Sequence, residues 1–407
     1  MIMKLKYIAA SLVCAAAFAG CQEAEEYIPS IYVTEAQIEP AKTITISGPG
    51  EVAEFSVSAS LAVDRETHVR LEIAPEMLES YNRNYGRQCE LLEEYDFEKK
   101  EVTIKAGKSV SDAAEIVVNQ TLELGKFYCL PVKIVETDGT MPVLEPSSTF
   151  YLVFRAPVHS KAVYLGRSNK YIVPGFYDYK VPAGAPEGTP DLSALSELTL
   201  ECRVMANNFQ GSDPYISSIM GLEGNVCMRF GDVKIGKDVV QVCKGDYQPA
   251  ATTVPCATGK WYHLAAVWSR SALRIYIDGR FITETPNRGE TVDITEVQLW
   301  NGSGIGFGIG AGSNYNSNRP LDGYIAEARV WSKALTGTEI ANLRDLVIVD
   351  PKTPGLLTYW KMNESEPISE TESNSRWRLN NKMVDLTGHG FDAKGQAANP
   401  TFIDATW

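Results

Sequence analysis

A short run of alternating carboxylates and aromatics is the stretch of this sequence that comes nearest to a catalytic pattern. Residues 94–98 read EYDFE. In a strand, successive side chains point to opposite faces, so Glu94, Asp96 and Glu98 would share one face. Hydrolysis of a glycosidic bond needs two carboxyl groups, one as acid and one as base or nucleophile. Two lysines follow directly, which is typical of a solvated charged turn, so we interpret the run as an exposed strand edge.

The rest of the sequence offers no recognisable catalytic motif. It contains no GxSxG, HExxH, Walker A or dinucleotide-binding pattern, and no second ExDxE occurs within 161–407. Residues 302–312 are glycine-rich but have no following lysine, so they predict a turn and a closely packed strand. No CxxC is present, which argues against a zinc site. We predict a protein that is not an enzyme.

The N-terminus is typical of an exported protein. Two lysines precede an apolar run over residues 7–18, and small residues follow before Cys21. The sequence FAGC resembles a bacterial lipobox, whose cysteine is acylated, and the next residues, QEAEE, resemble the acidic export signal of Bacteroidetes surface lipoproteins. We therefore expect a signal peptide over 1–20, lipidation at Cys21 followed by a linker over 21–42, and an outer-membrane lipoprotein that faces the cell exterior.

The charge balance excludes one class of partner. The 407 residues carry 51 acidic and 38 Lys or Arg side chains, for a formal net charge of −13. Residues 22–157 hold 24 acids and 12 bases, whereas residues 158–407 hold 27 and 24. No basic stripe exists to neutralise phosphates, so we expect no nucleic-acid partner. A nearly neutral C-terminal half suits a neutral ligand such as a sugar.

Short strands dominate the whole chain, and we predict an all-β protein. Over 43–157, apolar residues alternate with polar ones at the two-residue period of half-buried strands, with one short helix at 75–86, which predicts a compact, immunoglobulin-like β-sandwich. Over 161–407, many strands with Gly, Asn and Asp turns predict two packed sheets, a jelly roll. Asp278-Gly279 is a typical hairpin turn. We interpret 155–160 as the boundary between two domains.

Six cysteines remain after Cys21, and one pair is a disulfide candidate. Cys227 and Cys243 flank the turn GDVKIGKD and could face each other across a hairpin. Six cysteines allow 15 pairings, and cysteine is also a common buried small side chain. The pairing therefore stays open at the level of sequence.

Two resemblances add to this interpretation. SYNRNYG, EVTIKAGKS and LPVKI, in that order, make residues 30–155 similar to a domain of unknown function found at the N termini of Bacteroidetes surface lipoproteins encoded with glycan-utilisation systems. GKWYHLAAVWS, LRIYIDG, LDGYIAEARVWSKALTGTEI and GLLTYWKMNE make 161–407 resemble the laminin-G/concanavalin A-like lectin superfamily. The first resemblance implies a spacer domain, and the second implies a jelly roll that binds carbohydrate.

These resemblances imply a surface lipoprotein that captures oligosaccharide with its C-terminal domain, close to an outer-membrane glycan importer. Two alternatives remain open. One is a glycoside hydrolase of concanavalin A-like fold, and the other is an adhesion protein that binds a protein partner. Some members of the superfamily also hold Ca²⁺ with carboxylates and carbonyls. We place no calcium site and no other metal site on this sequence.

The candidate sugar-binding residues lie in predicted loops. Pyranose rings pack on aromatic faces, and their hydroxyls hydrogen-bond to amide, carboxylate or guanidinium groups. An ordinary loop residue that caps the core is the alternative interpretation for each. The candidates are Trp300, Asn314, Tyr315, Asn316, Arg319, Trp377, Arg378 and Tyr247.

Overall fold

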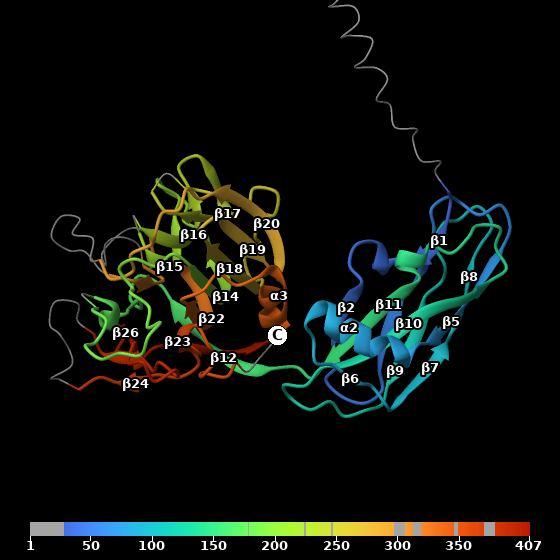
Figure 1. Ribbon diagram of the computed structural model, residues 1–407, viewed down its shortest axis with the longest axis horizontal. Helices are drawn as coiled ribbons and strands as arrows, with labels where there is room; N and C mark the ends of the chain where they lie inside the picture. Colours follow the sequence, from blue (N-terminus) through green and yellow to red (C-terminus); the bar gives the residue numbers. More distant parts are fainter. Residues whose placement is uncertain are drawn as a thin grey trace, which may run out of the picture.

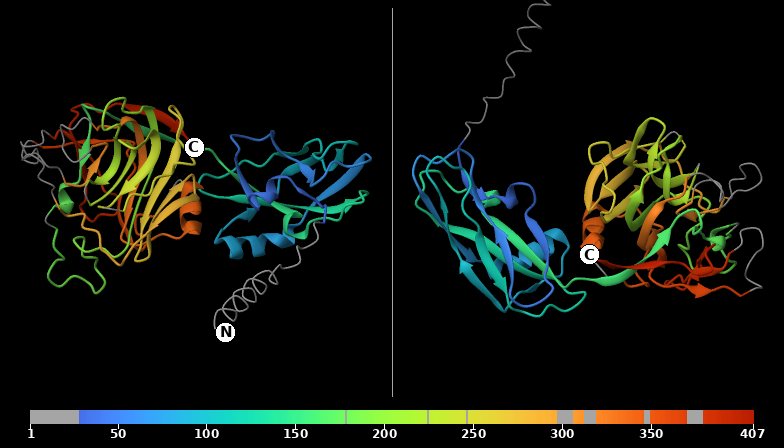
Figure 2. Two further views of the ribbon diagram at one scale, coloured as in Figure 1. Left: turned by 90° about the horizontal axis from the view of Figure 1, so that it is seen from above. Right: turned by 180° about the vertical axis from the view of Figure 1, so that it is seen from behind.

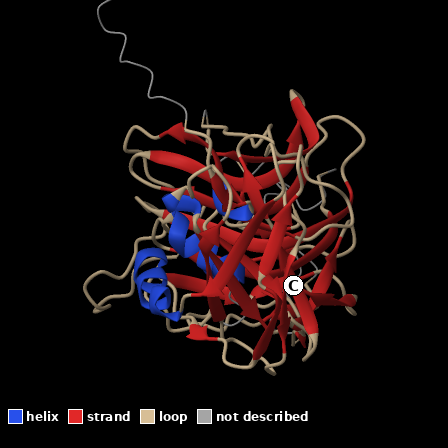
Figure 3. Cartoon of the chain, turned by 90° about the vertical axis from the view of Figure 1, so that its right-hand side faces the viewer, coloured by secondary structure: helices blue, strands red, loops and turns tan. Residues whose placement is uncertain are grey.

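The computed structural model describes residues 28–177, 179–223, 225–245, 247–296, 306–311, 319–345, 349–369 and 379–407. The chain forms two β-rich domains that lie side by side (Figures 1 and 2). Strands far outnumber helices in both (Figure 3), so the predicted all-β class, a sandwich followed by a jelly roll, is confirmed. No helix among the described residues is both long enough and apolar enough to cross a membrane.

The first domain is a sandwich around a single apolar core. Its largest sheet has the order β2-β11-β10-β5-β8, with β6 beside β10, and it faces the sheet β3-β9-β7 and the pair β1-β4. The elements are β1 (Ile31–Val33), η1 (Glu35–Gln37), β2 (Ala41–Thr45), β3 (Glu51–Phe55), β4 (Val57–Ala59), β5 (Thr67–Ile73), η2 (Pro75–Met77), α2 (Leu78–Tyr85), β6 (Glu90–Leu91), β7 (Tyr95–Lys99), β8 (Glu101–Ile104), β9 (Ala114–Val118), β10 (Tyr128–Thr137), η3 (Glu145–Ser147) and β11 (Thr149–Arg155).

Four of the five residues of the alternating run EYDFE lie on β7, at the edge of its sheet, and Glu94 directly precedes the strand. Tyr95 and Phe97 pack against the core, whereas Glu94, Asp96 and Glu98 are exposed. The aromatic side chains thus supply the buried face and the carboxylates the solvated one, as the two-residue period requires. The three carboxylates lie in the first domain rather than in the jelly roll.

The second domain is built from two large sheets. One has the order β20-β19-β18-β14-β22-β12-β27, with β23 beside β22, and the other has the order β17-β16-β15-β21-β13-β26-β25-β24. The elements are β12 (His159–Leu165), β13 (Tyr171–Ile172), η4 (Pro174–Phe176), β14 (Leu198–Asn208), β15 (Ser217–Leu222), β16 (Val226–Asp232), β17 (Ile235–Cys243), β18 (Tyr262–Trp268), β19 (Ala272–Ile277), β20 (Arg280–Pro286), β21 (Gly308–Ile309), β22 (Asp322–Trp331), α3 (Gly337–Asp345), β23 (Leu356–Trp360), β24 (Glu366–Pro367), β25 (Asn381–Met383), β26 (Ala393–Gly395) and β27 (Phe402–Thr406).

The core of the second domain lies between its two sheets and includes the fully buried Trp268 and Trp360. The opposite face of the β14 sheet is covered by α3, which packs on it through a second apolar cluster. A capping box opens this helix: Thr336 Oγ1 accepts from the Glu339 amide at 3.2 Å, and Glu339 accepts from the Thr336 amide at 2.7 Å. Figure 1 shows α3 on the side of the jelly roll that faces the first domain.

A short segment between β11 and β12 joins the two domains. Val158 in this segment exchanges two backbone hydrogen bonds with Trp407, at 3.2 and 3.3 Å. The end of β27 is therefore fastened to the interdomain connection. Asp345, at the end of α3, accepts a hydrogen bond from Arg87 of the first domain at 3.1 Å, so the two domains also meet through side chains.

Candidate functional site

The outer face of strands β15, β16 and β17 carries polar side chains because the strand period alternates core and non-core positions. On β16, Val226, Met228 and Phe230 enter the core. Arg229 and Cys227 therefore point to the opposite face of the sheet. We refer to the polar side chains around Arg229 on this face as the Arg229 cluster: Ser218, Glu223, Arg229, Asp232, Gln241 and Arg319.

The register of the three strands sets a row of polar residues across the sheet. Ser218 pairs with Arg229 on the neighbouring strand, and Arg229 pairs with Gln241 on the next. On β17, Val240 and Val242 enter the core on either side of Gln241. The row therefore places a hydroxyl, a guanidinium and a carboxamide side by side.

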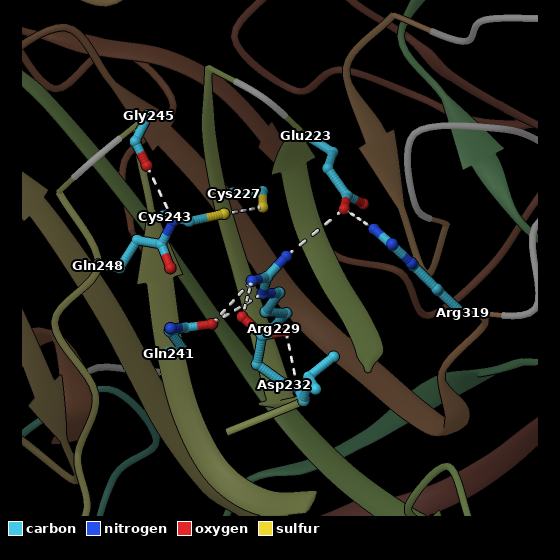
Figure 4. Close-up of polar contacts among 10 residues, drawn as sticks. Glu223, Cys227, Arg229, Asp232, Gln241, Cys243, Gly245, Gln248 and Arg319 are labelled. Atoms are coloured by element: carbon cyan, nitrogen blue, oxygen red, sulfur yellow. Dashed lines mark hydrogen bonds and ion pairs between the residues drawn. The ribbon is translucent and has the colours of Figure 1, made fainter. Parts of the chain in front are cut away.

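Arg229 is the centre of this cluster (Figure 4). Gln241 Oε1 accepts from Arg229 Nε at 3.0 Å and from Nη2 at 2.8 Å. Asp232 accepts from Nη2 at 2.7 Å, and Glu223 accepts from Nη1 at 3.4 Å. Arg229 is only 6 % exposed, and a buried charge needs compensation, which the two carboxylates supply. Together with Gln241, they fix the orientation of the guanidinium from three sides.

Glu223 also joins Arg319 to the cluster. The Arg319 guanidinium makes an ion pair with Glu223 Oε1, the same oxygen that faces Arg229. The backbone supports this arrangement, because the Ser218 amide donates to the Arg319 carbonyl at 3.0 Å. Burial lowers the pKa of Arg319, although the nearby Asp213 opposes the effect. One of the sequence-predicted residues thus lies in the cluster.

Two polar groups of the row have no partner among the described residues. Ser218 Oγ is buried and makes no hydrogen bond. Gln241 uses its carboxamide oxygen for Arg229, and its amide nitrogen engages no described residue. Unpaired buried polar groups cost free energy, and a ligand hydroxyl that bonds to them recovers it. The row therefore holds hydrogen-bonding capacity beside a fixed charge. Ser218 and Gln241 are only 6 % and 2 % exposed, and the more exposed members of the cluster are Glu223 and Arg319.

The floor next to the row is lined by backbone. Gly221 pairs with Cys227 on one side and with Gly308 on the other, so two neighbouring strands lack side chains here. Gly221 has φ +126°, and a Cβ built on it would lie 2.4 Å from the Val226 carbonyl oxygen. Only glycine fits at this position.

The disulfide candidate stays a prediction. Cys227 and Cys243 face each other across β16 and β17, as the hairpin predicts, with their sulfurs 2.9 Å apart and no covalent bond between them in this structure. The hydrogen bond from Cys243 and burial raise the pKa of Cys227. Buried cysteines in contact pack as small apolar side chains, and this pair lies beside Arg229 on the same face of the sheet (Figure 4).

Tyr247 has a partner on the core side. Its ring packs edge-on against Trp268 at 5.5 Å, and its hydroxyl donates to Glu290 at 3.1 Å. The structure therefore gives this residue the capping role that was the alternative interpretation. The remaining candidates, Trp300, Asn314, Tyr315, Asn316, Trp377 and Arg378, lie outside the described residues, as does Cys21.

Sequence reasoning missed most of the Arg229 cluster. Glu223, Arg229, Asp232 and Gln241 were not candidates, since they lie in or beside predicted strands rather than loops. A signal was present in the runs VCMRF and VVQVC, where the apolar alternation places Arg229 and Gln241 on the non-core face. Polar residues at such positions of adjacent strands are the pattern that would have found them.

A second group of charges lies on the outer face of the other sheet, but it is sealed. Glu201 accepts from Arg329 at 2.8 Å and from the Trp331 indole at 2.9 Å, and its other oxygen faces His263 at 3.0 Å. Each of these four side chains is at most 2 % exposed. The apolar cluster beneath α3 covers this face of the sheet, so this network supports the fold under the helix.

No metal centre is visible among the described residues, where no three His, Cys, Asp or Glu side chains gather as ligands. The polar clusters consist of arginines, amides and ion-paired carboxylates. Their chemistry is that of hydrogen bonding to polar ligand groups.

Comparisons with known proteins place both parts of the chain. Residues 184–341 match the model of the concanavalin A-like lectin/glucanases superfamily, and residues 26–141 match a model of an N-terminal domain. No curated protein matches the chain.

Solved structures similar to this chain include a proposed carbohydrate binding protein from Bacteroides ovatus, which is 22% identical, with 92% of this chain and 97% of that chain covered and a TM-score of 0.49. Bacteroides thetaiotamicron EndoBT-3987 with a Man5GlcNAc product is 16% identical over 31% of this chain and 30% of that one, with a TM-score of 0.25. Trypanosoma rangeli sialidase is 18% identical over 36% and 22%, with a TM-score of 0.28.

The two packed sheets, the sequence blocks along them and the matched model agree with one another. The C-terminal domain of this chain has a concanavalin A-like jelly-roll fold and, over residues 184–341, is similar to the lectin/glucanases superfamily; it follows a separate N-terminal β-sandwich.

Proposed function

We propose that this chain binds glycans, and that the Arg229 cluster on the outer face of β15–β17 is where it holds them. The observation that carries the proposal is the row of Ser218, Arg229 and Gln241, in which a fixed guanidinium stands between two polar groups with unused hydrogen-bonding capacity. Sugar hydroxyls both donate and accept, so they can satisfy such a row. The superfamily of the domain supports the same function.

The cluster favours binding over hydrolysis. Its two carboxylates, Asp232 and Glu223, both accept hydrogen bonds from Arg229, which is the arrangement of ionised groups. A glycoside hydrolase needs one carboxyl group that is protonated and can donate its proton to the leaving oxygen. Neither side chain is free for that role. We infer that the chain retains its ligand intact.

The sequence supports a place for this activity at the cell surface. The proposed lipid on Cys21 would anchor the chain to the outer membrane, with the first domain as a spacer and a glycan importer as neighbour. This arrangement keeps captured oligosaccharide close to the route of uptake. Proteolysis of intact cells checks it, since a chain that faces the exterior is cleaved without disruption of the membrane.

The experiment that tests glycan binding combines a glycan array with calorimetry. We expect Ser218→Ala to weaken binding of the best array ligand about fivefold or more, because a ligand hydroxyl loses its partner at the row. Thermal stability should not fall, since the buried hydroxyl has no partner in the described part of the protein. An array without binding, or a Ser218→Ala variant with full affinity, contradicts the proposal.

Thr358→Val is the matched control. Thr358 Oγ1 is also buried without a partner, but it lies on β23 in the other sheet. Its removal should leave both affinity and stability unchanged. Product analysis of the same mixtures distinguishes retention from cleavage, because shortened oligosaccharides appear only if the chain hydrolyses its ligand.

A further inference from the structure

The junction between the two domains encloses a cleft of about 540 Å³ that the proposed lectin function does not use. Residues of η1 and β2 form one wall, and residues of β14, α3 and the turn before β20 form the other. Cleft volumes of this size accommodate small ligands, and domain junctions are a common place for them.

The carboxylates of this cleft that form ion pairs are already neutralised. Asp345 accepts from Arg344 at 2.7 Å and from Arg87 at 3.1 Å. Glu39 makes an ion pair with Arg280 at 2.6 Å on the rim. These pairs use up Arg344, Arg87 and Arg280 as well as both acids, so none of them provides charge for a ligand.

Three further cations line the cleft without an ion pair among the described residues: Lys42, Arg155 and Arg203. The Asp345 carboxylate interacts with both arginines through its charge alone, and the acids Glu35 and Asp278 also line the cleft. Arg155 donates only to the backbone carbonyl of Asp345, at 3.2 Å, and Arg203 only to the backbone carbonyl of Arg344. The Nε groups of both arginines are buried and unbonded. Arg203 is 6 % exposed, and its guanidinium lies over the Trp407 ring at 4.9 Å.

This arrangement places like charges together in a partly desolvated space. Burial lowers the pKa of Arg203 to about 10, repulsion from Arg329 and Arg155 adds to that effect, and attraction to Glu327 and Asp345 only partly opposes it. Buried cations are normally compensated by an anion. Guanidinium groups with unused N–H donors favour planar oxyanions, which can accept two hydrogen bonds at once.

We propose that the cleft is a second binding site, which takes the carboxylate or sulfate group of an acidic saccharide. Arg155 and Arg203 would donate to the oxyanion from the β11 and β14 sides, and Lys42 would add its charge from β2. That the ligand is a saccharide rests on the proposed function; the oxyanion site itself rests only on the cleft. The bound group would contact both domains and hold them together.

Calorimetry on the full chain tests this proposal with four probes: sodium sulfate, sodium glucuronate, a uronate-containing tetrasaccharide and a neutral glucan tetrasaccharide, all at constant ionic strength. We expect the tetrasaccharide with uronate to bind more tightly than glucuronate or sulfate alone. Arg155→Gln and Lys42→Gln should each weaken its binding about tenfold. Preference for sulfate over glucuronate would identify a sulfate ester as the natural source of the oxyanion.

Arg280→Gln is the matched control, because it removes a cation of the same cleft that Glu39 already neutralises. The affinity of Arg280→Gln for the uronate-containing tetrasaccharide should stay within twofold of that of the wild type. Absence of binding to all three anionic probes, or equal losses in Arg155→Gln and Arg280→Gln, overturns the proposal. A structural role for Arg155 alone would lower the melting temperature of Arg155→Gln and leave anion affinity of the folded protein unchanged, which also contradicts the site.

The Ser218→Ala variant separates this proposal from the first one. It should bind the anionic probes like the wild type, because Ser218 lies on β15 and does not line the cleft. If the glycan array shows no binding while sulfate binding depends on Arg155, the oxyanion site stands and the lectin function fails.

Discussion

At the scale of single residues, Glu201 shows how much one buried charge can matter. Burial alone would raise its pKa, but Arg329, His263 and Trp331 together lower it to about 2 from an ordinary value of 4.5. A carboxyl group whose pKa is lower in the folded than in the unfolded state stabilises the fold at pH values above its pKa in the unfolded state. This stabilisation is lost as the pH falls toward the pKa in the folded state. Burial also lowers the pKa of His263 below 6.5, so its protonation in acid opposes folding in the same direction.

We therefore expect Glu201→Gln to lower the free energy of unfolding by about 3–5 kcal/mol at neutral pH, because Arg329 loses a buried partner. The variant should also lose less stability than the wild type between pH 5 and pH 2. Urea unfolding at a series of pH values measures both effects. Glu284→Gln, which removes an acid from the partly exposed pair with Arg274, should cost about 0–1 kcal/mol. Equal losses in the two variants would contradict this account.

At the scale of strands, the Arg229 cluster depends on the exact register of β15 against β16. Gly221 permits it, since a Cβ there would lie 2.4 Å from the Val226 carbonyl oxygen and 2.6 Å from the Cys227 Cα. We expect Gly221→Ala to destabilise the domain by several kcal/mol, through a steric clash and a strained positive φ. Thermal unfolding measures the loss. Gly245→Ala is the comparison, because a Cβ at Gly245 meets no atom within 4 Å although its φ is also positive; a loss as large as that of Gly221→Ala would refute the steric argument.

The strands also show which parts of the fold and of the candidate site could be predicted from the sequence. The two-residue period and the spacing of the turns predicted the sandwich and the jelly roll. The period also placed EYDFE correctly, because its aromatics had to face the core. The Arg229 cluster could not be predicted in the same way. Its members meet through cross-strand pairing of β15, β16 and β17, and register between strands depends on turns and packing that the local pattern does not contain.

At the scale of the whole molecule, Asp345 couples the two domains. Burial opposes its ionisation, but Arg344, Arg87 and Arg155 hold its pKa below the ordinary 3.8. Because its pKa is lowered, Asp345 contributes fully to the interdomain contact at pH values above its pKa in the unfolded state. This contribution is lost as the pH falls through the pKa of Asp345 in the folded state. Each domain has a core of its own, so loss of the contact should separate the domains rather than unfold them.

Asp345→Asn should weaken the interdomain contact by about 3–5 kcal/mol, since three arginines lose their shared carboxylate. We expect a larger radius of gyration in solution scattering and faster proteolysis within 156–158, with each domain still folded. Glu39→Gln, which removes only the rim pair with Arg280, should change neither measurement appreciably. An unchanged radius of gyration in Asp345→Asn would show that Asp345 does not hold the domains together.

The two backbone hydrogen bonds between Val158 and Trp407 have a practical consequence. They hold the end of β27 next to the segment that joins the two domains, where the Trp407 ring lies beside the guanidinium of Arg203. A fluorophore attached just after Trp407 would therefore report on the angle between the lobes, and energy transfer from it to a dye on α2 could follow in real time how ligands alter that angle.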